Sequence, residues 1–289
     1  VVASGLRMPA GVAFHAGDLY VSAVERIVVL RDIERHLDDP PPPEVVTDRL
    51  PGERHHGWRF IGFGPDGRLY VPIGAPCNVC DKGRDYAKLI SMRADGSDWR
   101  DEAYGIRNTV GFDWQPGTRQ LWFTDNGRDL LGDDLPSDEL NRVSRRGEHF
   151  GFPYCHQGDT LDSEFGAGHS CADYTAPAWK LGAHVAALGM RFYTGGQFPA
   201  RWRGAVLIAE HGSWNRSEKS GYRVVAVHLD GGRGVAQDVL VDGFQRDENT
   251  RGRPADVLPL PDGSVLVSDD LAGAVYRITF DGPAARTSP

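Results

Sequence analysis

Histidine and arginine residues occur in short polar clusters along this chain, at positions where they could bind an anion or move a proton. His55 and His56 stand side by side, and either could act as a general base because imidazole titrates near neutral pH. Arg107, Arg251 and Arg253 carry guanidinium groups, which bind planar carboxylates through paired hydrogen bonds. Together these residues predict a site for an anionic planar ligand beside a base.

A second set of chemically useful side chains lies in one acidic segment. It holds six acidic residues around glycine and proline, namely Asp125, Asp129, Asp133, Asp134, Asp138 and Glu139. Carbonyl and carboxylate oxygens are the ligands that Ca²⁺ prefers, so this segment could bind calcium. The acids do not follow the spacing of an EF-hand, and a solvated acidic loop is the alternative interpretation.

A repeated pattern indicates which elements position these clusters. An apolar run, a turn with Gly, Asp or Pro, a second apolar run and a polar loop recur in copies that begin at Gly11, Phe60, Thr109, Gly189 and Asp256. Two such runs around a turn predict a hairpin, and repeats of roughly 45 to 75 residues suit propeller blades. We therefore expect an all-β protein, a β-propeller with five visible blade repeats, which forms a single domain over residues 1–289.

The order of strands in a blade predicts where the polar clusters meet. In a four-stranded blade, the loop before the innermost strand and the loop after the second strand lie at the same end. The loops expected before inner strands hold Arg54–His56, Gly105–Asn108, His184 and Arg251–Arg253. Those expected after second strands hold Asp125–Arg128, Glu210–Gly212 and Asp269–Asp270. Nearly every unusual polar cluster is thus expected on one face, although solvation alone would account for each cluster taken singly.

The chain has four cysteines, with Cys77 and Cys80 in a CNVC tetrad, followed by Cys155 and Cys171. An even count in a loop-rich β protein favours two disulfides and an exported location, periplasmic or secreted. Free thiols are the first alternative. A zinc site is the second, and the spacing of Cys155 and Cys171 argues against it because a second CxxC pair would be typical. We expect Cys155 and Cys171 to be bonded to each other.

Composition and charge exclude other classes of protein. The net charge is −8 at pH 7 and no basic block is present, which argues against nucleic acid as a partner. No apolar run is long enough to span a membrane, while an apolar content of 40% is ample for a core. The sequence starts at Val1 without Met, which is compatible with the removal of a leader.

Several separated motifs resemble one known family. They are HHGWRFIGFGPDGRLYVPIGAPCNVC, GIRNTVGFDW, WFTDNGRD, DDLPSDELNRV, HFGFPYCHQG and IAEHGSWNRS. In this order they are similar to the glucose/sorbosone dehydrogenases that depend on pyrroloquinoline quinone (PQQ), and most similar to the L-sorbosone dehydrogenase-like branch. The resemblance implies a six-bladed propeller that binds PQQ and Ca²⁺ and oxidises a sugar hydroxyl or aldehyde carbon by hydride transfer to the quinone.

The resemblance also implies a general base, which two neighbouring residues could supply. The spacing H-x-G-x-R, with Gly57 and Arg59, selects His55. Counting back from Gly64–Asp66 selects His56 instead. We favour His55 from the sequence and keep His56 as the alternative.

The remaining site residues follow from the same resemblance. Arg107 would stabilise charge on the reduced quinone. Backbone carbonyls of Gly127 and Arg128 would hold the calcium ion, which polarises the quinone. Further contacts to the cofactor are implied for Asn108, His184, Arg251, Arg253 and Asp270.

Two departures from the family pattern bear on these expectations. Where glucose-oxidising members carry a cofactor-binding lysine, this chain has Glu210–Gly212, so that His211 or Arg216 would substitute or the contact would be absent. The chain also shows five repeats where the family has six. Either a copy precedes Val1, or Val1–Leu6 pairs with the strand Ala274–Phe280 and closes a five-bladed ring, which would avoid two exposed sheet edges.

Three functions are compatible with the sequence. A quinoprotein dehydrogenase would act on a small sugar and would pass its electrons to an external acceptor, because the chain has no CxxCH haem motif. A metal-dependent lactonase-type propeller would need several inward carboxylates around Ca²⁺, whereas this set of residues is richer in arginine. A carbohydrate- or protein-binding propeller without catalysis is the third.

Overall fold

The computed structural model describes residues 1–282, and its regular structure consists of strands and short 3-10 turns. The chain separates into two compact units. The first comprises residues 1–110 and 145–175, and the second comprises residues 111–144 and the chain from residue 176 onward. The expectation of a single domain stays a prediction.

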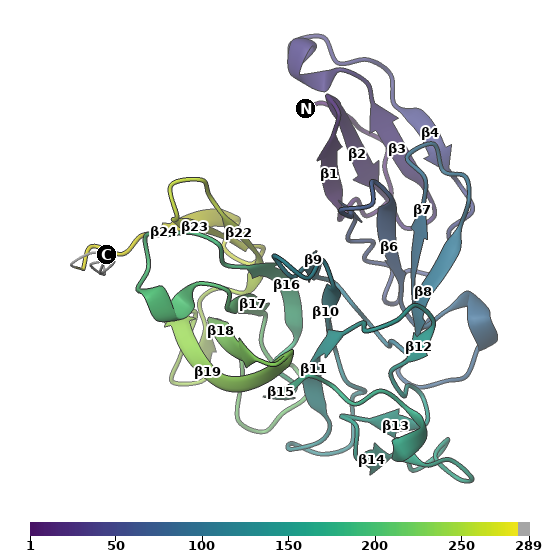
Figure 1. Ribbon diagram of the computed structural model, residues 1–289, viewed down its shortest axis with the longest axis vertical. Coiled ribbons are helices and arrows are strands. Elements are labelled where there is room, and N and C mark those ends of the chain that lie inside the picture. The colour runs from purple at the N-terminus through teal and green to yellow at the C-terminus, as the bar shows by residue number, and fades with distance from the viewer. Residues whose placement is uncertain (283–289) are drawn as a thin grey trace. The chain divides into compact units, whose positions relative to one another are not determined.

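The first unit contains two sheets. One has the order β1-β2-β3-β4, with bounds Val12–His15, Asp18–Ser22, Ile27–Leu30 and Glu44–Thr47, and its strands lie side by side in Figure 1. The other has the order β12-β8-β7-β6-β5, with bounds Glu148–His149, Arg100–Tyr104, Lys88–Met92, Leu69–Ile73 and Gly62–Phe63. A hairpin of β13 and β14, Cys155–His156 and Thr160–Leu161, follows β12.

The second unit contains three sheets. The first has β9, β10, β11 and β15, with bounds Phe112–Trp114, Leu121–Asp125, Ser137–Arg142 and Trp179–Ala183. The next has β16, β17, β18 and β19, with bounds Ala187–Phe192, Val206–Glu210, Arg223–Asp230 and Arg233–Val241. The last has β22, β23 and β24, with bounds Pro254–Pro259, Val265–Asp269 and Ala274–Ile278, and is preceded by a hairpin of β20 and β21, Gln245–Arg246 and Asn249–Thr250.

These sheets are five blades of a β-propeller, and the predicted fold class is confirmed. Each predicted repeat coincides with the first two strands of a sheet. Within a unit, consecutive sheets pack face to face through apolar side chains. In the first unit, Val29 of β3, Val71 of β6 and Ile90 of β7 share one core. In the second, β17 and β18 present Leu207 and Val224 toward Val267 of β23.

Glycine directly precedes the inner strand in two of the repeats, at Gly11 and Gly111, because the neighbouring blade approaches too closely for a side chain. A Cβ atom on Gly11 would lie 2.3 Å from the carbonyl oxygen of Arg59, in front of β5. A Cβ atom on Gly111 would lie 2.4 Å from the carbonyl oxygen of Leu188 in β16. The bond from the Thr124 hydroxyl to the Leu188 carbonyl, 2.6 Å long, joins the same two blades. The repeated glycine is therefore a packing requirement between inner strands.

Of the two alternatives for the N-terminal segment, the pairing of Val1–Leu6 with the last blade is not observed. Val1–Leu6 contains no strand, and Val2, Ala3 and Leu6 pack instead on the core of the first blade. Within residues 1–282, β24 has β23 as its only partner in the sheet. The segment cannot continue as a strand because Gly5 has a φ angle of +72°, and burial of its apolar side chains on Val21 and Leu30 favours the nearer blade.

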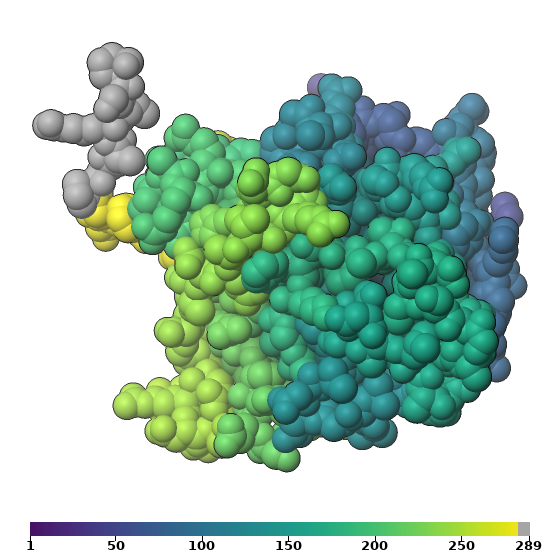
Figure 2. Space-filling view, turned by 60° about the horizontal axis from the view of Figure 1, so that its bottom comes forward, coloured from purple at the N-terminus to yellow at the C-terminus, as the bar shows by residue number. Residues whose placement is uncertain are grey.

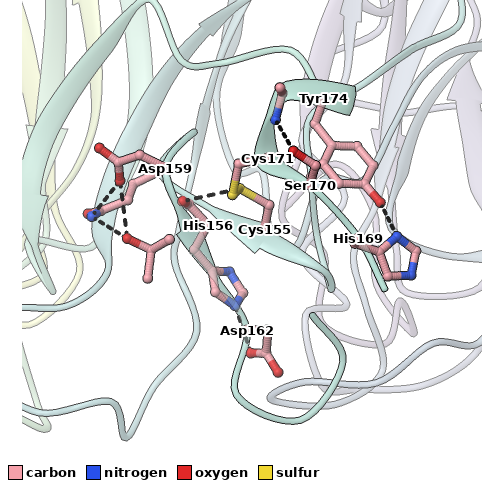
Figure 3. The surroundings of a disulfide bond; sticks show 12 residues. Cys155, His156, Asp159, Asp162, His169, Ser170, Cys171 and Tyr174 are labelled. Atoms are coloured by element: carbon pink, nitrogen blue, oxygen red, sulfur yellow. Dashed lines mark hydrogen bonds and ion pairs between the residues drawn. A yellow bond between two sulfur atoms is a disulfide. The ribbon is translucent and has the colours of Figure 1, made fainter. Parts of the chain in front are cut away.

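Both disulfides favoured by the sequence are present, and the Cys155–Cys171 prediction is confirmed. Figure 3 shows the Cys155–Cys171 bond, which closes the segment between β13 and the short 3-10 turn Cys171–Asp173. Cys77 and Cys80 form a four-residue ring directly after β6. The structure describes no helix in residues 1–282 that has the length and apolarity to cross a membrane.

Removing the Cys155–Cys171 bond is expected to destabilise the fold. The bond joins residues 16 apart in sequence, and a loop of this size predicts a loss of about 3 kcal/mol in the free energy of unfolding. Urea unfolding of a Cys155→Ser/Cys171→Ser variant measures the loss. The Cys77→Ser/Cys80→Ser variant is the matched control, because a shorter ring restricts the unfolded chain less. Equal midpoints for the wild type and the first variant would contradict the prediction.

Candidate functional site

Antiparallel pairing places the predicted loops of each blade at one end. In the fourth blade, Ala187 at the start of β16 pairs with Glu210 at the end of β17, so His184 and His211 belong to loops at the same end. In the fifth blade, Pro254 pairs with Asp269, which places Arg253 and Asp270 together in the same way. The expected sorting of polar loops within a blade is thus observed.

The two candidate bases of the first unit have different surroundings. His55 is exposed, whereas His56 is partly buried, and their ring centroids are 4.0 Å apart. The Nδ1 atom of His56 lies 2.8 Å from the carbonyl oxygen of Ala75. Because a carbonyl only accepts, Nδ1 must donate, and the Nε2 lone pair of the neutral ring is left to accept a proton.

Burial, followed by the charge of Arg107, lowers the pKa of His56 from 6.5 to about 2. The ring is therefore neutral at any ordinary working pH, with its tautomer set by Ala75. An anion bound near Arg107 would offset the guanidinium charge and raise this pKa. The geometry supports His56 as the better positioned of the two histidines.

The disulfide ring after β6 holds Arg107. The Nε atom of Arg107 donates to the carbonyl oxygen of Asn78 over 2.8 Å, and Nη2 donates to its side-chain Oδ1 over 2.9 Å. Asn78 lies inside the four-residue ring closed by Cys77 and Cys80. Only 3% of Arg107 is exposed, so these bonds compensate a buried charge.

The backbone joins Arg107 to the same loop as His56. The amide of Ala75 donates to the carbonyl oxygen of Arg107 over 2.8 Å, while the carbonyl oxygen of Ala75 accepts from His56. No side chain fits at Gly74, because a Cβ atom there would lie 2.6 Å from the Cβ of His56. Three segments of the first unit therefore fix a neutral imidazole and a guanidinium in one small region.

In the second unit, the predicted calcium residues lie in the loop between β10 and β11. The amide of Gly127 donates to Oδ1 of Asp138 over 2.8 Å, and Oδ2 of Asp138 accepts from the amide of Ala186 over 2.7 Å. A Cβ atom on Gly127 would lie 2.8 Å from Cγ of Pro136, so only glycine fits there. Asp138 thus connects this loop to the loop before β16.

His184 holds the same loop from its other side. Its Nε2 atom lies 2.8 Å from the carbonyl oxygen of Gly132 and donates to it. His184 is 6% exposed, and its φ angle of +59° places it in the left-handed region. The family resemblance implied a cofactor contact for His184, and in the structure its side chain holds the carbonyl of Gly132 instead.

The carboxylates of the acidic segment are used mainly to hold the loop between β17 and β18. Asp129 accepts from Asn215 over 3.1 Å, and Asp134 pairs with Arg216 over 3.1 Å. The amide of Ser217 donates to Asp133 and lowers its pKa. Within residues 1–282, no group of three or more His, Cys, Asp or Glu side chains could hold a metal ion. The assignment of the backbone carbonyls of Gly127 and Arg128 as calcium ligands stays a prediction.

The arginines of the last blade differ in how firmly they are held. The guanidinium of Arg253 donates to the carbonyl oxygens of His211 and Gly212 over 3.1 and 2.6 Å and lies 5.6 Å above the ring of Tyr222. Arg251 is exposed, and within residues 1–282 its side chain forms no ion pair. Arg251 thus has a guanidinium available for an anion, whereas Arg253 positions the loop that carries His211.

His211 and Asp270 form a pair in the second unit, with Nε2 of the ring 2.9 Å from Oδ1 of the carboxylate. Burial lowers the pKa of His211, and the hydrogen bond to Asp270 opposes this shift. A neutral His211 ring that donates to Asp270 through Nε2 has its Nδ1 lone pair left to accept a hydrogen bond.

Sequence reasoning missed Asn78, and it named Asp138 and Glu210 only as members of polar segments, without the partners that they have in the structure. The position of Asn78 between two cysteines was a signal that a constrained loop carries it. Glu210 is fully buried at the end of β17, and its Oε2 lies 2.6 Å from Nε of Arg223. No periodicity in the sequence pairs Glu210 with Arg223, since the partner lies on the next strand after a long loop.

Glu210 is expected to make stability depend on pH. Burial raises its pKa from 4.5 to about 7, although Arg223 opposes the shift. The folded protein then binds this proton more tightly than the unfolded chain, so stability falls as pH rises from about 4.5 to about 7. Glu210→Gln should flatten this slope. Urea midpoints of both proteins across this range measure the effect, and identical slopes would contradict it.

The chain is similar to known proteins in sequence and in fold. Residues 43–277 match the model of the family described as glucose/sorbosone dehydrogenase. An uncharacterised protein of Borreliella burgdorferi is 32% identical over 294 residues, which cover 97% of this chain and 78% of that protein. The aldose sugar dehydrogenase YliI of Escherichia coli is 24% identical over 253 residues, which cover 80% of this chain and 62% of that enzyme.

A solved structure has the same fold. It is the holo form of the PQQ domain of pyranose dehydrogenase from Coprinopsis cinerea, with a TM-score of 0.78 and 17% identity. The match covers 96% of this chain and 94% of that domain. At this level of identity the likeness concerns the fold alone.

Proposed function

Because the chain belongs to the glucose/sorbosone dehydrogenase family, we propose that it oxidises a sugar or a sugar-derived aldehyde or alcohol with PQQ as its cofactor and Ca²⁺ beside the cofactor. The main support for the proposal is that a neutral, oriented histidine, His56, and a buried arginine, Arg107, are held by the same region of the first unit. When bound, PQQ supplies an acceptor for the hydride of the substrate.

His56 is the proposed general base. Its Nε2 atom would accept the proton of a substrate hydroxyl, while Ala75 keeps the proton on Nδ1. Its low pKa makes it a weak base in the absence of a ligand, and an anionic cofactor near Arg107 would raise that pKa toward the useful range. His55 stays the alternative base, because its exposed ring lies next to that of His56.

Arg107 is proposed to stabilise negative charge that develops during the reaction. A guanidinium held in place before the reaction needs no reorganisation when charge appears, which is the source of such stabilisation. The two hydrogen bonds that Arg107 donates to Asn78 fix the guanidinium. Asn108, which follows Arg107, is proposed to contact the cofactor.

The second unit is proposed to supply cofactor and metal ligands. The carbonyl oxygens of Gly127 and Arg128 fit a hard cation, and Asp138 holds their loop. Arg251 would bind a cofactor carboxylate. His184 and Arg253, expected from the sequence to touch the cofactor, would act by positioning these loops, and the pair of His211 and Asp270 would provide a polar contact.

The electrons are proposed to pass to an external acceptor, and the two disulfides support an oxidising location such as the periplasm or the exterior of the cell. The test is direct. The purified chain is incubated with PQQ and CaCl₂, and reduction of a dye is followed with glucose and other aldoses. We expect reduction that needs PQQ, calcium and sugar together. Saturable binding of PQQ with no dye reduction by any aldose would overturn the assignment as a sugar dehydrogenase.

A further inference from the structure

The first unit contains a cavity of about 440 Å³ that none of the predicted site residues lines. Three segments form it: the loop after β6, the end of β8, and the segment from Gly147 to Tyr154. Ala75, which holds His56, belongs to its lining. The cavity is therefore next to the proposed base without containing it, and its size is typical of a small-molecule site.

Several contacts hold the walls of this cavity in place. The hydroxyl of Tyr154 donates to Oδ2 of Asp81 over 2.6 Å, which joins the late segment to the loop after β6. The ring of His149 fits only because residue 105 is glycine, since a Cβ atom there would lie 2.4 Å from the ring. Such contacts are typical of a site that is formed before its ligand arrives.

Residues that do not line the cavity also hold its wall in place. The ring of His169 stacks on Tyr154 with centroids 3.9 Å apart, and the hydroxyl of Tyr174 lies 2.6 Å from Nδ1 of His169. Figure 3 shows His169 and Tyr174 beside the Cys155–Cys171 disulfide, which closes this segment. Residues 147–174 belong to the teal part of the chain, which lies at the surface in the space-filling view (Figure 2).

The cavity presents hydrogen-bond donors and acceptors beside aromatic rings. Nδ1 of His149 accepts from the amide of Gly151 over 3.1 Å, so the proton of the neutral ring is on Nε2, which can donate. Burial lowers the pKa of His149 and keeps the ring neutral. Lys82 and Arg84 add exposed donors, and the carboxylate of Asp81 adds acceptors.

This combination of polar groups and aromatic rings is suited to binding a sugar ring. A sugar carries C–H groups on its faces, which pack on aromatic rings, and hydroxyl groups on its edge, which both donate and accept. Tyr86, Tyr104 and Tyr154 line the cavity as aromatic partners. The exposed polar groups of Asp81, Lys82 and Arg84 favour a ligand that carries hydroxyl groups over a purely apolar one.

We propose that this cavity is a saccharide subsite that binds a sugar unit other than the one being oxidised. This inference rests on the proposed function, because it assigns a di- or oligosaccharide as the substrate class. The oxidised unit cannot be the one in the cavity, since neither His56 nor Arg107 belongs to the lining.

The test measures binding without catalysis. Isothermal titration of the whole chain, with no PQQ or calcium added, compares maltose and cellobiose with glucose. At least one disaccharide should bind ~10-fold more tightly than glucose. The Lys82→Ala/Arg84→Ala variant should weaken that binding ~10-fold, and both residues are exposed, so folding should be unaffected. An Arg35→Ala/Arg93→Ala variant, with the same charge change outside the cavity, is the matched control.

The outcomes separate this inference from the proposed function. Equal binding of disaccharides and glucose, or disaccharide binding that the Lys82→Ala/Arg84→Ala variant leaves unchanged, overturns the subsite even if aldoses are oxidised. Binding that depends on Lys82 and Arg84 supports the subsite even if no dye is reduced, and the dehydrogenase assignment then fails alone.

Discussion

Replacing His56 with alanine is expected to lower the rate of sugar oxidation by ~10² or more, the usual cost of losing a positioned base. The reason is that His56 has its Nδ1 proton held by Ala75 and its Nε2 lone pair available. PQQ binding should change little, because the neutral ring contributes no charge to an anionic cofactor. Titration with PQQ, followed by the rate of dye reduction, separates the catalytic step from PQQ binding. We expect the maximal rate to fall and the PQQ concentration that gives half of the maximal rate to stay unchanged.

His55→Ala is the matched control for this prediction. It removes an exposed imidazole next to His56, and we expect a loss of less than ~10-fold, since within residues 1–282 the structure shows no hydrogen bond that fixes the His55 ring. The reverse ranking, with His55→Ala inactive and His56→Ala active, would show that the spacing of H-x-G-x-R selects the base. Full activity in both variants would contradict a histidine base in this chain.

Arg107 is expected to be the second residue with a large effect. Arg107→Ala should lower kcat by ~10² to 10³, as removal of a preorganised charge-stabilising donor does in other enzymes. Asn78→Ala removes the bond from Nη2 of Arg107 to the side-chain oxygen of Asn78, and a bond to a charged group of this kind predicts a loss of ~10-fold. Steady-state kinetics of both variants measures kcat and KM separately.

Two further variants distinguish positioning from simple damage to the loop. Asn78→Asp keeps an acceptor oxygen for Arg107 and should restore most of the rate lost in Asn78→Ala. Val79→Ala alters the same disulfide ring without touching Arg107 and should be close to wild type. Equal losses in Asn78→Asp and Asn78→Ala would contradict a positioning role for the side chain.

The blades could be predicted from the sequence because their signals are local. Turn residues between β-favouring runs determine each hairpin, and the glycine before two inner strands, Gly11 and Gly111, marks the close approach of the neighbouring blade. The pairing of Val1–Leu6 could not be predicted in this way. Its apolar residues were compatible with either edge, and packing on Val21 and Leu30 decided the outcome.

The site was predictable as a set of residue types but less so as a set of roles. The side chain of Asn78 holds Arg107 across 29 residues of sequence, and His184 holds Gly132 across 52. Such contacts join loops of separate strands, so no spacing in the sequence encodes them. For the same reason the sequence favoured His55 without any signal of the difference in burial and hydrogen bonding between His55 and His56, which arises from the fold around Ala75.

One measurement tests the central claim most directly. The chain is supplied with PQQ and CaCl₂, and the initial rate of dye reduction is compared for glucose and for glucose deuterated at C1. If the protein catalyses hydride transfer from that carbon, the deuterated sugar should react several-fold more slowly at saturation whenever hydride transfer limits the rate. Rapid mixing of the enzyme with sugar, without dye, separates hydride transfer from the reoxidation of the cofactor. A reductive step observed by rapid mixing that has the same rate with both sugars would contradict the account.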